Sequence, residues 1–272
     1  MREIELDNIS NNVKENGIAS IKNFLKPNQF LNAKKILQYI NDQKIAKADP
    51  KGYFPINLQA NILKFIKLDF NKIYKAIILK SIAKDLKLRA IADNIFGQKT
   101  ELHMIDSYYS KQSQTNIIDW HNDIGFRNLE NNKKKRDIKA MSIKFFFYMT
   151  DVENENGSLA YIPYSHHVVR AVTSLMQEKK IKLSVYWGLE DLRNLVLNKE
   201  TKNLVISKIG QKRYETFIKN TKFIEEQNKD TKNFDFQMKK GSVLIFDEIG
   251  VHRGSRPSKQ GRLVLRYFYR RK

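Results

Sequence analysis

The middle of the chain carries the run Ile143-Lys144-Phe145-Phe146-Phe147-Tyr148-Met149, in which nearly every residue is apolar or aromatic. A strand with one face in water alternates apolar and polar side chains, whereas a strand covered on both faces reads as an almost continuous apolar run. The run therefore predicts a strand with packing on both sides.

Strand-like segments continue on either side of this run, from about residue 101 to the end of the chain. Short apolar stretches separated by turn residues are expected at 101–109, 116–123, 139–150, 158–163, 241–247 and 262–270. Many short strands of this kind are typical of a double-sheet jelly roll. We therefore predict a mainly β fold with flanking helices, in the α+β class, in which residues 101–272 form the jelly-roll core.

Residues 1–100 are expected to be mainly helical and to pack against the outside of a sheet. Pro27 suits the first turn of a helix whose apolar residues include Phe30 and Ile36. Helical periodicity returns around residues 62–66 and from 73 to 88. Residues 46–55, between these segments, are expected to form a loop that could approach the mouth of a site.

A second helical stretch is expected at residues 168–230, including 189–197 and 213–223, where it would interrupt the strands. Long insertions often carry specificity, so this one is interpreted as a lid or a substrate-selection element. The alternative is a structural flap or a dimerisation surface. The oligomeric state stays open. The length of 272 residues suits one domain that spans the whole chain.

The composition excludes several classes of protein. The chain has no cysteine, which excludes disulfides, thiolate metal sites and cysteine nucleophiles. No apolar run approaches the roughly 18 to 20 residues that span a bilayer, and the N-terminus lacks the basic and then apolar pattern of a signal peptide. A soluble, cytoplasmic protein without a membrane span is therefore expected.

The formal net charge of +21 indicates an anionic partner without naming one. Lysine greatly outnumbers arginine, so the charge is spread rather than built for bidentate phosphate recognition. The densest run, Lys133-Lys134-Lys135-Arg136, is interpreted as a solvated loop rather than a phosphate-binding patch. We expect a small, anionic substrate, and we regard nucleic acid as the weaker alternative.

Two short motifs far apart in the sequence carry candidate metal ligands. The first is Asp119-Trp120-His121-Asn122-Asp123, and the second is Val251-His252-Arg253-Gly254. Residues i and i+2 of a strand project from one face, so His121 and Asp123 can reach the same metal ion while a third ligand arrives from another strand. With His252, they make up the two histidines and one carboxylate that hold non-haem Fe(II) with open coordination positions.

These motifs stand in an order that resembles the phytanoyl-CoA dioxygenase family of Fe(II)- and 2-oxoglutarate-dependent oxygenases. The matching stretches are Trp120-His121-Asn122-Asp123, then the turn from Glu155-Asn156-Gly157 to Ile162-Pro163-Tyr164-Ser165-His166, then Gly241-Ser242-Val243-Leu244-Ile245-Phe246, and finally His252 with Arg262. Tyr164 stands where the family usually has glycine, and Ser242 where it often has aspartate. The resemblance covers about residues 102 to 269 and implies the double-stranded β-helix, which is the cupin-like jelly roll.

The resemblance also implies the cofactors and their ligands. His121, Asp123 and His252 would hold Fe(II), and an arginine about ten residues after the distal histidine would bind the far carboxylate of 2-oxoglutarate. Arg262 is favoured for this role over Arg266, because it lies ten residues after His252.

Three other polar residues have weaker claims to the site. Ser255 could add a hydroxyl group to the 2-oxoglutarate carboxylate, although a turn serine is more often a local cap. His166 is interpreted as structural, and His103 as a core or surface residue rather than a ligand.

The implied activity is that of a dioxygenase, which consumes O2 and 2-oxoglutarate and releases succinate and CO2 while it oxidises a C–H bond. Hydroxylation of an unactivated C–H bond in a small anionic metabolite or acyl thioester is the expected reaction. Desaturation, ring closure and epimerisation stay open, whereas Asp123 argues against a halogenase, because related halogenases generally lack this carboxylate. The alternatives are a non-catalytic jelly roll that binds an anionic partner and an oxygenase that acts on nucleic acid.

Overall fold

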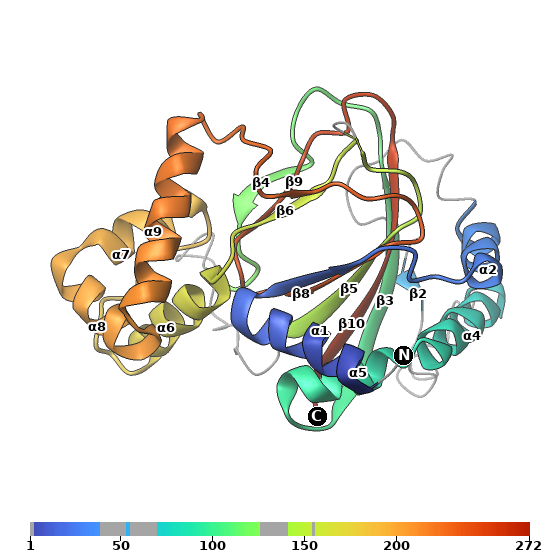
Figure 1. The fold of residues 1–272 in the computed structure, drawn as a ribbon, viewed down its shortest axis with the longest axis horizontal. Helices are drawn as coiled ribbons and strands as arrows, with labels where there is room; N and C mark the ends of the chain where they lie inside the picture. The colour runs from blue at the N-terminus through green and yellow to red at the C-terminus, as the bar shows by residue number, and fades with distance from the viewer. Residues whose placement is uncertain (1–2, 39–52, 55–69, 126–140, 154–155) are drawn as a thin grey trace.

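The computed structural model describes residues 3–38, 53–54, 70–125, 141–153 and 156–272, and its centre is a pair of antiparallel sheets (Figure 1). The larger sheet has the strand order β1 (Ile18–Ile21), β8 (Val243–Asp247), β5 (Ser142–Tyr148), β10 (Arg262–Arg271), β3 (Thr100–Ser110) and β2 (Tyr53–Phe54). The smaller sheet has the order β4 (Ile118–His121), β9 (His252–Gly254), β6 (Leu159–Tyr161) and β7 (Asp235–Phe236). The predicted jelly roll with flanking helices is confirmed.

Strand β5 lies between β8 and β10 and is buried at every position, as its apolar run predicts. Its side chains alternate between two apolar clusters. Phe145 and Phe147 belong to the cluster on the outer face of the large sheet. Phe146 and Tyr148 belong to the cluster between the two sheets, with Leu159 of the small sheet. The space between the sheets is therefore lined by every second residue of β5.

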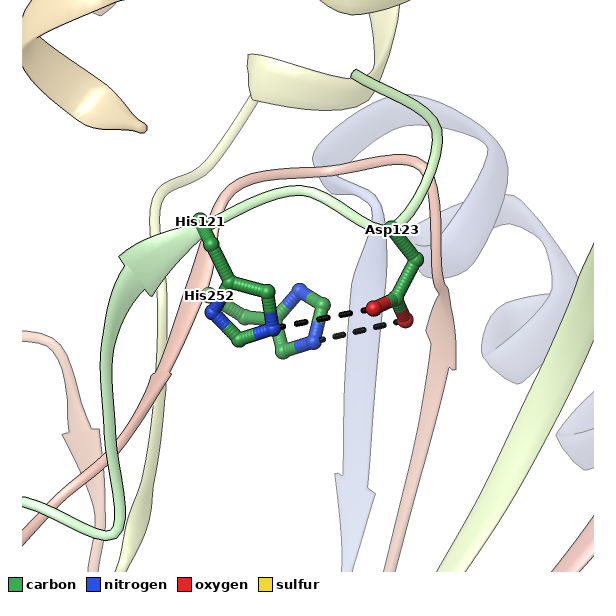
Figure 2. Close-up of side chains that lie close together, drawn as sticks. All are labelled: His121, Asp123 and His252. Atoms are coloured by element: carbon green, nitrogen blue, oxygen red, sulfur yellow. Dashed lines mark ion pairs between the residues drawn. The ribbon is translucent and has the colours of Figure 1, made fainter. Parts of the chain in front are cut away.

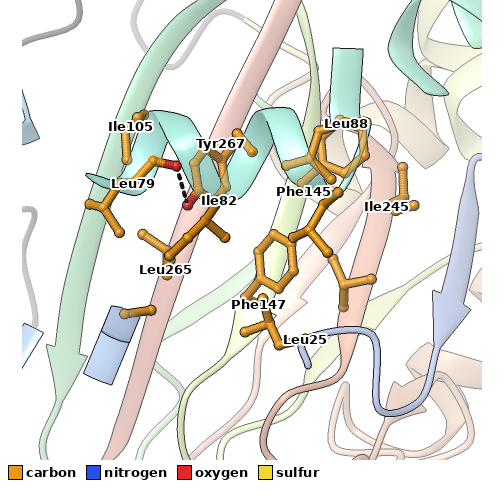
Figure 3. Packing of buried hydrophobic residues seen from close by; sticks show 14 of the residues in the cluster. Leu25, Leu79, Ile82, Leu88, Ile105, Phe145, Phe147, Ile245, Leu265 and Tyr267 are labelled. Atoms are coloured by element: carbon orange, nitrogen blue, oxygen red, sulfur yellow. Dashed lines mark hydrogen bonds between the residues drawn. The ribbon is translucent and has the colours of Figure 1, made fainter. Parts of the chain in front are cut away.

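In the described part of the chain, four helices cover the outer face of the large sheet, and their apolar residues complete its core (Figure 1). They are α1 (Glu3–Asn16), α2 (Pro27–Leu37), α4 (Phe70–Asp85) and α5 (Leu88–Phe96). Figure 3 shows Leu79, Ile82 and Leu88 against Phe145 and Tyr267, whose hydroxyl donates a hydrogen bond to the Leu79 carbonyl oxygen at 3.0 Å. The predicted support of the sheet by N-terminal helices is confirmed, and Pro27 is the first residue of α2 as expected.

Four more helices form the insertion and lie together beside the small sheet (Figure 1): α6 (Ser165–Gln177), α7 (Leu189–Leu197), α8 (Lys199–Ile209) and α9 (Gln211–Glu226). Their buried residues, such as Val172, Leu192 and Phe217, share one apolar cluster with Ala160 and Val251 of the small-sheet region. The helical insertion is therefore anchored on the outer face of the small sheet. No helix in the described part of the chain is long and apolar enough to cross a membrane.

The structure corrects the prediction in two short segments. Residues 18–21 were expected in a helical region but form β1, whose Ile18 pairs with Phe246 of β8. Residues 53–54 were expected in a loop but form β2 at the sheet edge. The rest of the 46–55 loop, the expected helix around residues 62–66 and the basic run 133–136 lie outside the described residues.

Candidate active site

Three candidate ligands from two distant parts of the sequence meet between the two sheets (Figure 2). His121 ends β4 and His252 begins β9, and these two residues are cross-strand partners. Asp123 Oδ1 lies 3.6 Å from His121 Nε2, and Asp123 Oδ2 lies 3.7 Å from His252 Nε2. One ligand atom from each residue lies within 4.8 Å of the other two, which is close enough to share a metal ion. The fold thus brings together all three predicted residues.

The backbone fixes the two imidazole rings in the tautomer that a metal requires. His121 Nδ1 lies 2.7 Å from the Asp119 carbonyl oxygen, and His252 Nδ1 lies 2.8 Å from the Gly250 carbonyl oxygen. A carbonyl oxygen can only accept, so each Nδ1 carries the proton and donates it. Each Nε2 then presents a lone pair towards Asp123, as in metal sites where a ligating histidine donates its other N–H to a backbone carbonyl.

Asn122 turns the chain between the two ligands of the first motif. Its side chain is fully buried, donates to the carbonyl oxygen of Tyr186 at 2.6 Å and accepts from the backbone N–H of Ile124 at 3.2 Å. The amide therefore points away from the site, as expected. The strand expected to reach residue 123 ends at His121, so a local turn, and not strand alternation, directs the Asp123 carboxylate towards the histidines.

The site favours an ionised Asp123 carboxylate and a neutral His252 ring. Burial would raise the pKa of the Asp123 carboxyl, but the Lys144 ammonium, with smaller contributions from the two histidines, holds it well below its usual range. Burial lowers the pKa of His252 to about 3, assisted by His121, while Asp123 opposes the change. Protons therefore compete only weakly with a metal for Asp123 and His252 near neutral pH. A divalent cation could bind without first displacing protons from these two side chains.

Arg262 is the most deeply buried of the predicted anion-binding residues. Its Nη1 donates to the Gly157 carbonyl oxygen, its Nη2 donates to the Tyr108 hydroxyl oxygen at 2.8 Å, and its Nε is buried without a partner among the described residues. Arg266, the alternative, is engaged differently, because its Nε and Nη2 both donate to the Asp106 carboxylate, at 2.7 and 2.6 Å. Of the two guanidinium groups, Arg262 is the one with a fully buried N–H that has no acceptor among the described residues.

Ser255 is buried near this region, but its hydroxyl donates to Asp235 Oδ1 at 2.9 Å. Asp235 also accepts from Arg253 at 3.0 Å and from the Ser158 hydroxyl at 2.8 Å. These contacts tie the turn after β9 to strands β6 and β7. Contact of Ser255 with 2-oxoglutarate stays a prediction.

Tyr164 explains how the chain departs from the glycine of the family motif. Its φ angle is +65°, which is the left-handed region where glycine is favoured because it has no Cβ. The tyrosine keeps the conformation of the turn at the cost of local strain. In the second departure, the Ser242 hydroxyl accepts a hydrogen bond from the backbone N–H of Asn23 at 3.4 Å and thereby ties β8 to the segment after β1.

The remaining histidines lie away from the triad. His166 is buried and its Nε2 donates to the Lys14 carbonyl oxygen at 3.1 Å, and burial lowers its pKa to about 4. This contact ties the insertion to α1 and agrees with the structural role expected. His103 on β3 is exposed.

Three residues at the site were missed in the sequence. The ammonium of Lys144 on β5 contacts Asp123, and it lies 3.2 Å from Glu248 Oε2. The Trp187 ring lies 5.3 Å from the His121 ring, between centroids, and comes from the insertion. Lys144 had a detectable signal, because it is the single charge in the apolar run of β5. Trp187 had none, since nothing in the sequence places residue 187 beside residue 121.

A jelly roll that brings two imidazoles and a carboxylate together between its sheets has the ligand set of the non-haem Fe(II) oxygenases. The model of the family "Phytanoyl-CoA dioxygenase (PhyH)" matches residues 13–264, and the chain belongs to this family. It is a 2-oxoglutarate-dependent non-haem iron dioxygenase, with Fe(II) as its metal and 2-oxoglutarate and O2 as cosubstrates.

Solved structures with the same fold share little sequence with the chain. HygX from Streptomyces hygroscopicus, with nickel and 2-oxoglutarate bound, is 14% identical with a TM-score of 0.55, over 97% of this chain and 86% of HygX. The epimerase SnoN, in complex with Fe3+, alpha ketoglutarate and nogalamycin RO, is 12% identical with a TM-score of 0.55, over 99% and 85%. AviO1 from Streptomyces viridochromogenes Tue57 is 12% identical with a TM-score of 0.55, over 99% and 96%. No curated protein sequence matches the chain.

Proposed function

We propose that the enzyme hydroxylates an unactivated C–H bond of a small molecule, with Fe(II) held by His121, Asp123 and His252. The observation that carries this proposal is the convergence of two Nε2 lone pairs and one ionised carboxylate on a single point between the sheets. Three protein ligands leave three of six positions for the cosubstrate and O2. The bound iron would supply the oxidising chemistry, and the chain positions what reacts there.

Arg262 is proposed to bind the far carboxylate of 2-oxoglutarate. The partnerless Nε of its buried guanidinium supports this role, because a buried donor requires an acceptor. The aromatic rings of Tyr108 and Phe146 lie beside the guanidinium, at 5.5 and 5.4 Å from their centroids, and exclude water from it. A charge-assisted pair in such surroundings is stronger than one in water.

The substrate is proposed to be a small molecule with an anionic group, such as a metabolite or an acyl thioester. The net charge of +21 supports an anionic partner. A small molecule also agrees with the hygromycin B bound to HygX and the nogalamycin RO bound to SnoN. Hydroxylation is favoured over halogenation by the carboxylate of Asp123. The cytoplasmic location expected from the sequence stays a prediction.

Anaerobic titration of the metal-free protein with Fe(II), and then with 2-oxoglutarate, tests the core of this proposal. Chelation of the 2-oxo acid at an open Fe(II) site should give a weak charge-transfer band at about 500 nm. We expect the band in the wild type and in His103→Ala, which changes an exposed histidine, and we expect its loss in His121→Ala. A wild type that binds iron without giving the band would contradict the assignment of the cosubstrate.

A further inference from the structure

Lys144 is an unusual lysine in a chain that is rich in surface lysines. Its side chain is only 8% exposed, and its ammonium contacts Asp123 Oδ2 and lies 3.2 Å from Glu248 Oε2. It also lies 5.7 and 5.3 Å from the ring centroids of Phe246 and Phe268. A buried charge of this kind is costly unless it is paired, so the two carboxylates determine where the ammonium sits.

Glu248, whose carboxylate contacts Lys144, is anchored to strand β5. Its Oε1 accepts from the backbone N–H of Ser142 at 2.6 Å, and its own N–H donates to the Ser142 carbonyl oxygen at 3.3 Å. The carboxylate is thus fixed to the start of β5, two residues before Lys144. The contact between Lys144 and Asp123 is therefore imposed by the sheet.

Stability alone does not account for a lysine here. The same face of β5 carries Phe146 and Tyr148, and the neighbouring strands contribute Phe246 and Phe268. An apolar side chain would suit these surroundings, and replacing a buried ion pair by apolar residues is often neutral or stabilising. The lysine must be explained by what it contacts.

The contact with Lys144 distinguishes the two carboxylate oxygens of Asp123, because the ammonium contacts Oδ2. Oδ1 lies 3.6 Å from His121 Nε2 and Oδ2 lies 3.7 Å from His252 Nε2, so both oxygens face the point where the imidazoles converge. Such a carboxylate could bind a metal through one oxygen or through two. Only one-oxygen binding leaves three positions open, as two atoms of 2-oxoglutarate and one O2 molecule require.

We propose that Lys144, held by Glu248, is a positioning residue that occupies Asp123 Oδ2 and so restricts the metal to Oδ1. The inference rests on the proposed function, because it assumes that Asp123 is a metal ligand. Among the described residues, Lys144 contacts neither histidine, and its direct contact with the triad is its ion pair with Asp123. Its role is to preserve the coordination position that the cosubstrate needs.

The test compares Lys144→Met with the wild type, by anaerobic calorimetric titration of Fe(II) and then of 2-oxoglutarate. Without the ammonium, both oxygens of Asp123 are available and no cation repels the metal, so the dissociation constant for Fe(II) should be unchanged or lower. The dissociation constant for 2-oxoglutarate should rise by about tenfold or more, which is the scale of effects from groups next to metal ligands. Opposite responses to metal and cosubstrate are the signature of the proposed role.

Two further variants keep the test decisive. Glu248→Gln retains an acceptor for the Ser142 N–H but removes the negative charge that helps to hold Lys144, so its dissociation constant for 2-oxoglutarate should rise, by less than that of Lys144→Met. Lys144→Gln can still donate to Oδ2, and its affinity for 2-oxoglutarate should lie between those of the wild type and Lys144→Met. Near-ultraviolet circular dichroism shows whether Lys144→Met folds. If it does not, Lys144→Gln takes its place in the test.

Two outcomes would overturn the proposal. Wild-type affinities for both metal and 2-oxoglutarate in Lys144→Met would show that the lysine positions nothing, and a parallel loss of both would show that it only assembles the site. A wild type that binds no metal would instead remove the proposed function itself. The wild-type titration therefore separates the two failures.

Discussion

Replacement of Arg262 by lysine tests the residue assigned to the cosubstrate. Lysine keeps the positive charge but offers one nitrogen in place of the planar fork, whose Nη1 and Nη2 are already committed to Gly157 and Tyr108. The variant should therefore lose one charge-assisted hydrogen bond to 2-oxoglutarate, which contributes about 1.5 to 3 kcal/mol. Since about 1.4 kcal/mol is tenfold in affinity, the dissociation constant should rise by about 10- to 150-fold.

The assay is calorimetric titration of 2-oxoglutarate into protein loaded anaerobically with Fe(II), and the matched control is Arg266→Lys. Arg266 gives two donors to buried Asp106, so its replacement should lower the free energy of unfolding and leave the affinity for 2-oxoglutarate near that of the wild type. Iron affinity should be unchanged in Arg262→Lys. Unchanged binding of 2-oxoglutarate in Arg262→Lys, together with its loss in Arg266→Lys, would refute the assignment.

Three other predictions concern stability. The pKa of buried His166 is lowered to about 4, so its neutral form stabilises the fold above pH 6.5 and this contribution is lost as the pH falls towards 4. When the pH is lowered from 6.5 to 5, the free energy of unfolding of the wild type, measured in urea, should therefore fall by about 2 kcal/mol more than that of His166→Gln. Tyr164→Gly should raise the free energy of unfolding by up to about 1 kcal/mol, whereas Tyr164→Val, which is β-branched at a φ of +65°, should lower it. Mn(II) at a hundred times its dissociation constant should stabilise the wild type by about 2.7 kcal/mol in the same assay and should not stabilise His252→Ala.

The sequence predicts the elements whose pattern is long enough to be recognised. The fully apolar run at residues 143–149 identifies β5, and the extended segments at 101–109 and 262–270 agree with β3 and β10. The segments that were missed are short. The four residues of β1 and the two residues of β7 contain too few positions for a period of two to stand out, and each becomes a strand because a neighbouring strand pairs with it.

The metal ligands were predicted because their chemistry and spacing are local properties of the sequence. The residues that surround Asp123 were not predicted, because their positions depend on strand pairing. Lys144 was interpreted only as part of an apolar strand. Glu248 follows β8, about a hundred residues later in the sequence. Only the pairing of β5 with β8 brings these two side chains together. A lone lysine in a strand buried on both faces was nevertheless a signal that an anion lies opposite it.

One cluster of buried and half-buried charges around the site balances internally, in contrast to the whole chain at +21. Among the described residues it comprises three cations and three carboxylates: Lys144, Arg262, Arg266, Asp106, Asp123 and Glu248. The excess of lysine therefore lies outside this cluster. Fe(II) alone would add two positive charges to this balanced cluster, and the 2-oxoglutarate dianion would restore neutrality. Metal and cosubstrate should consequently bind with positive coupling, each raising the affinity for the other by the same factor.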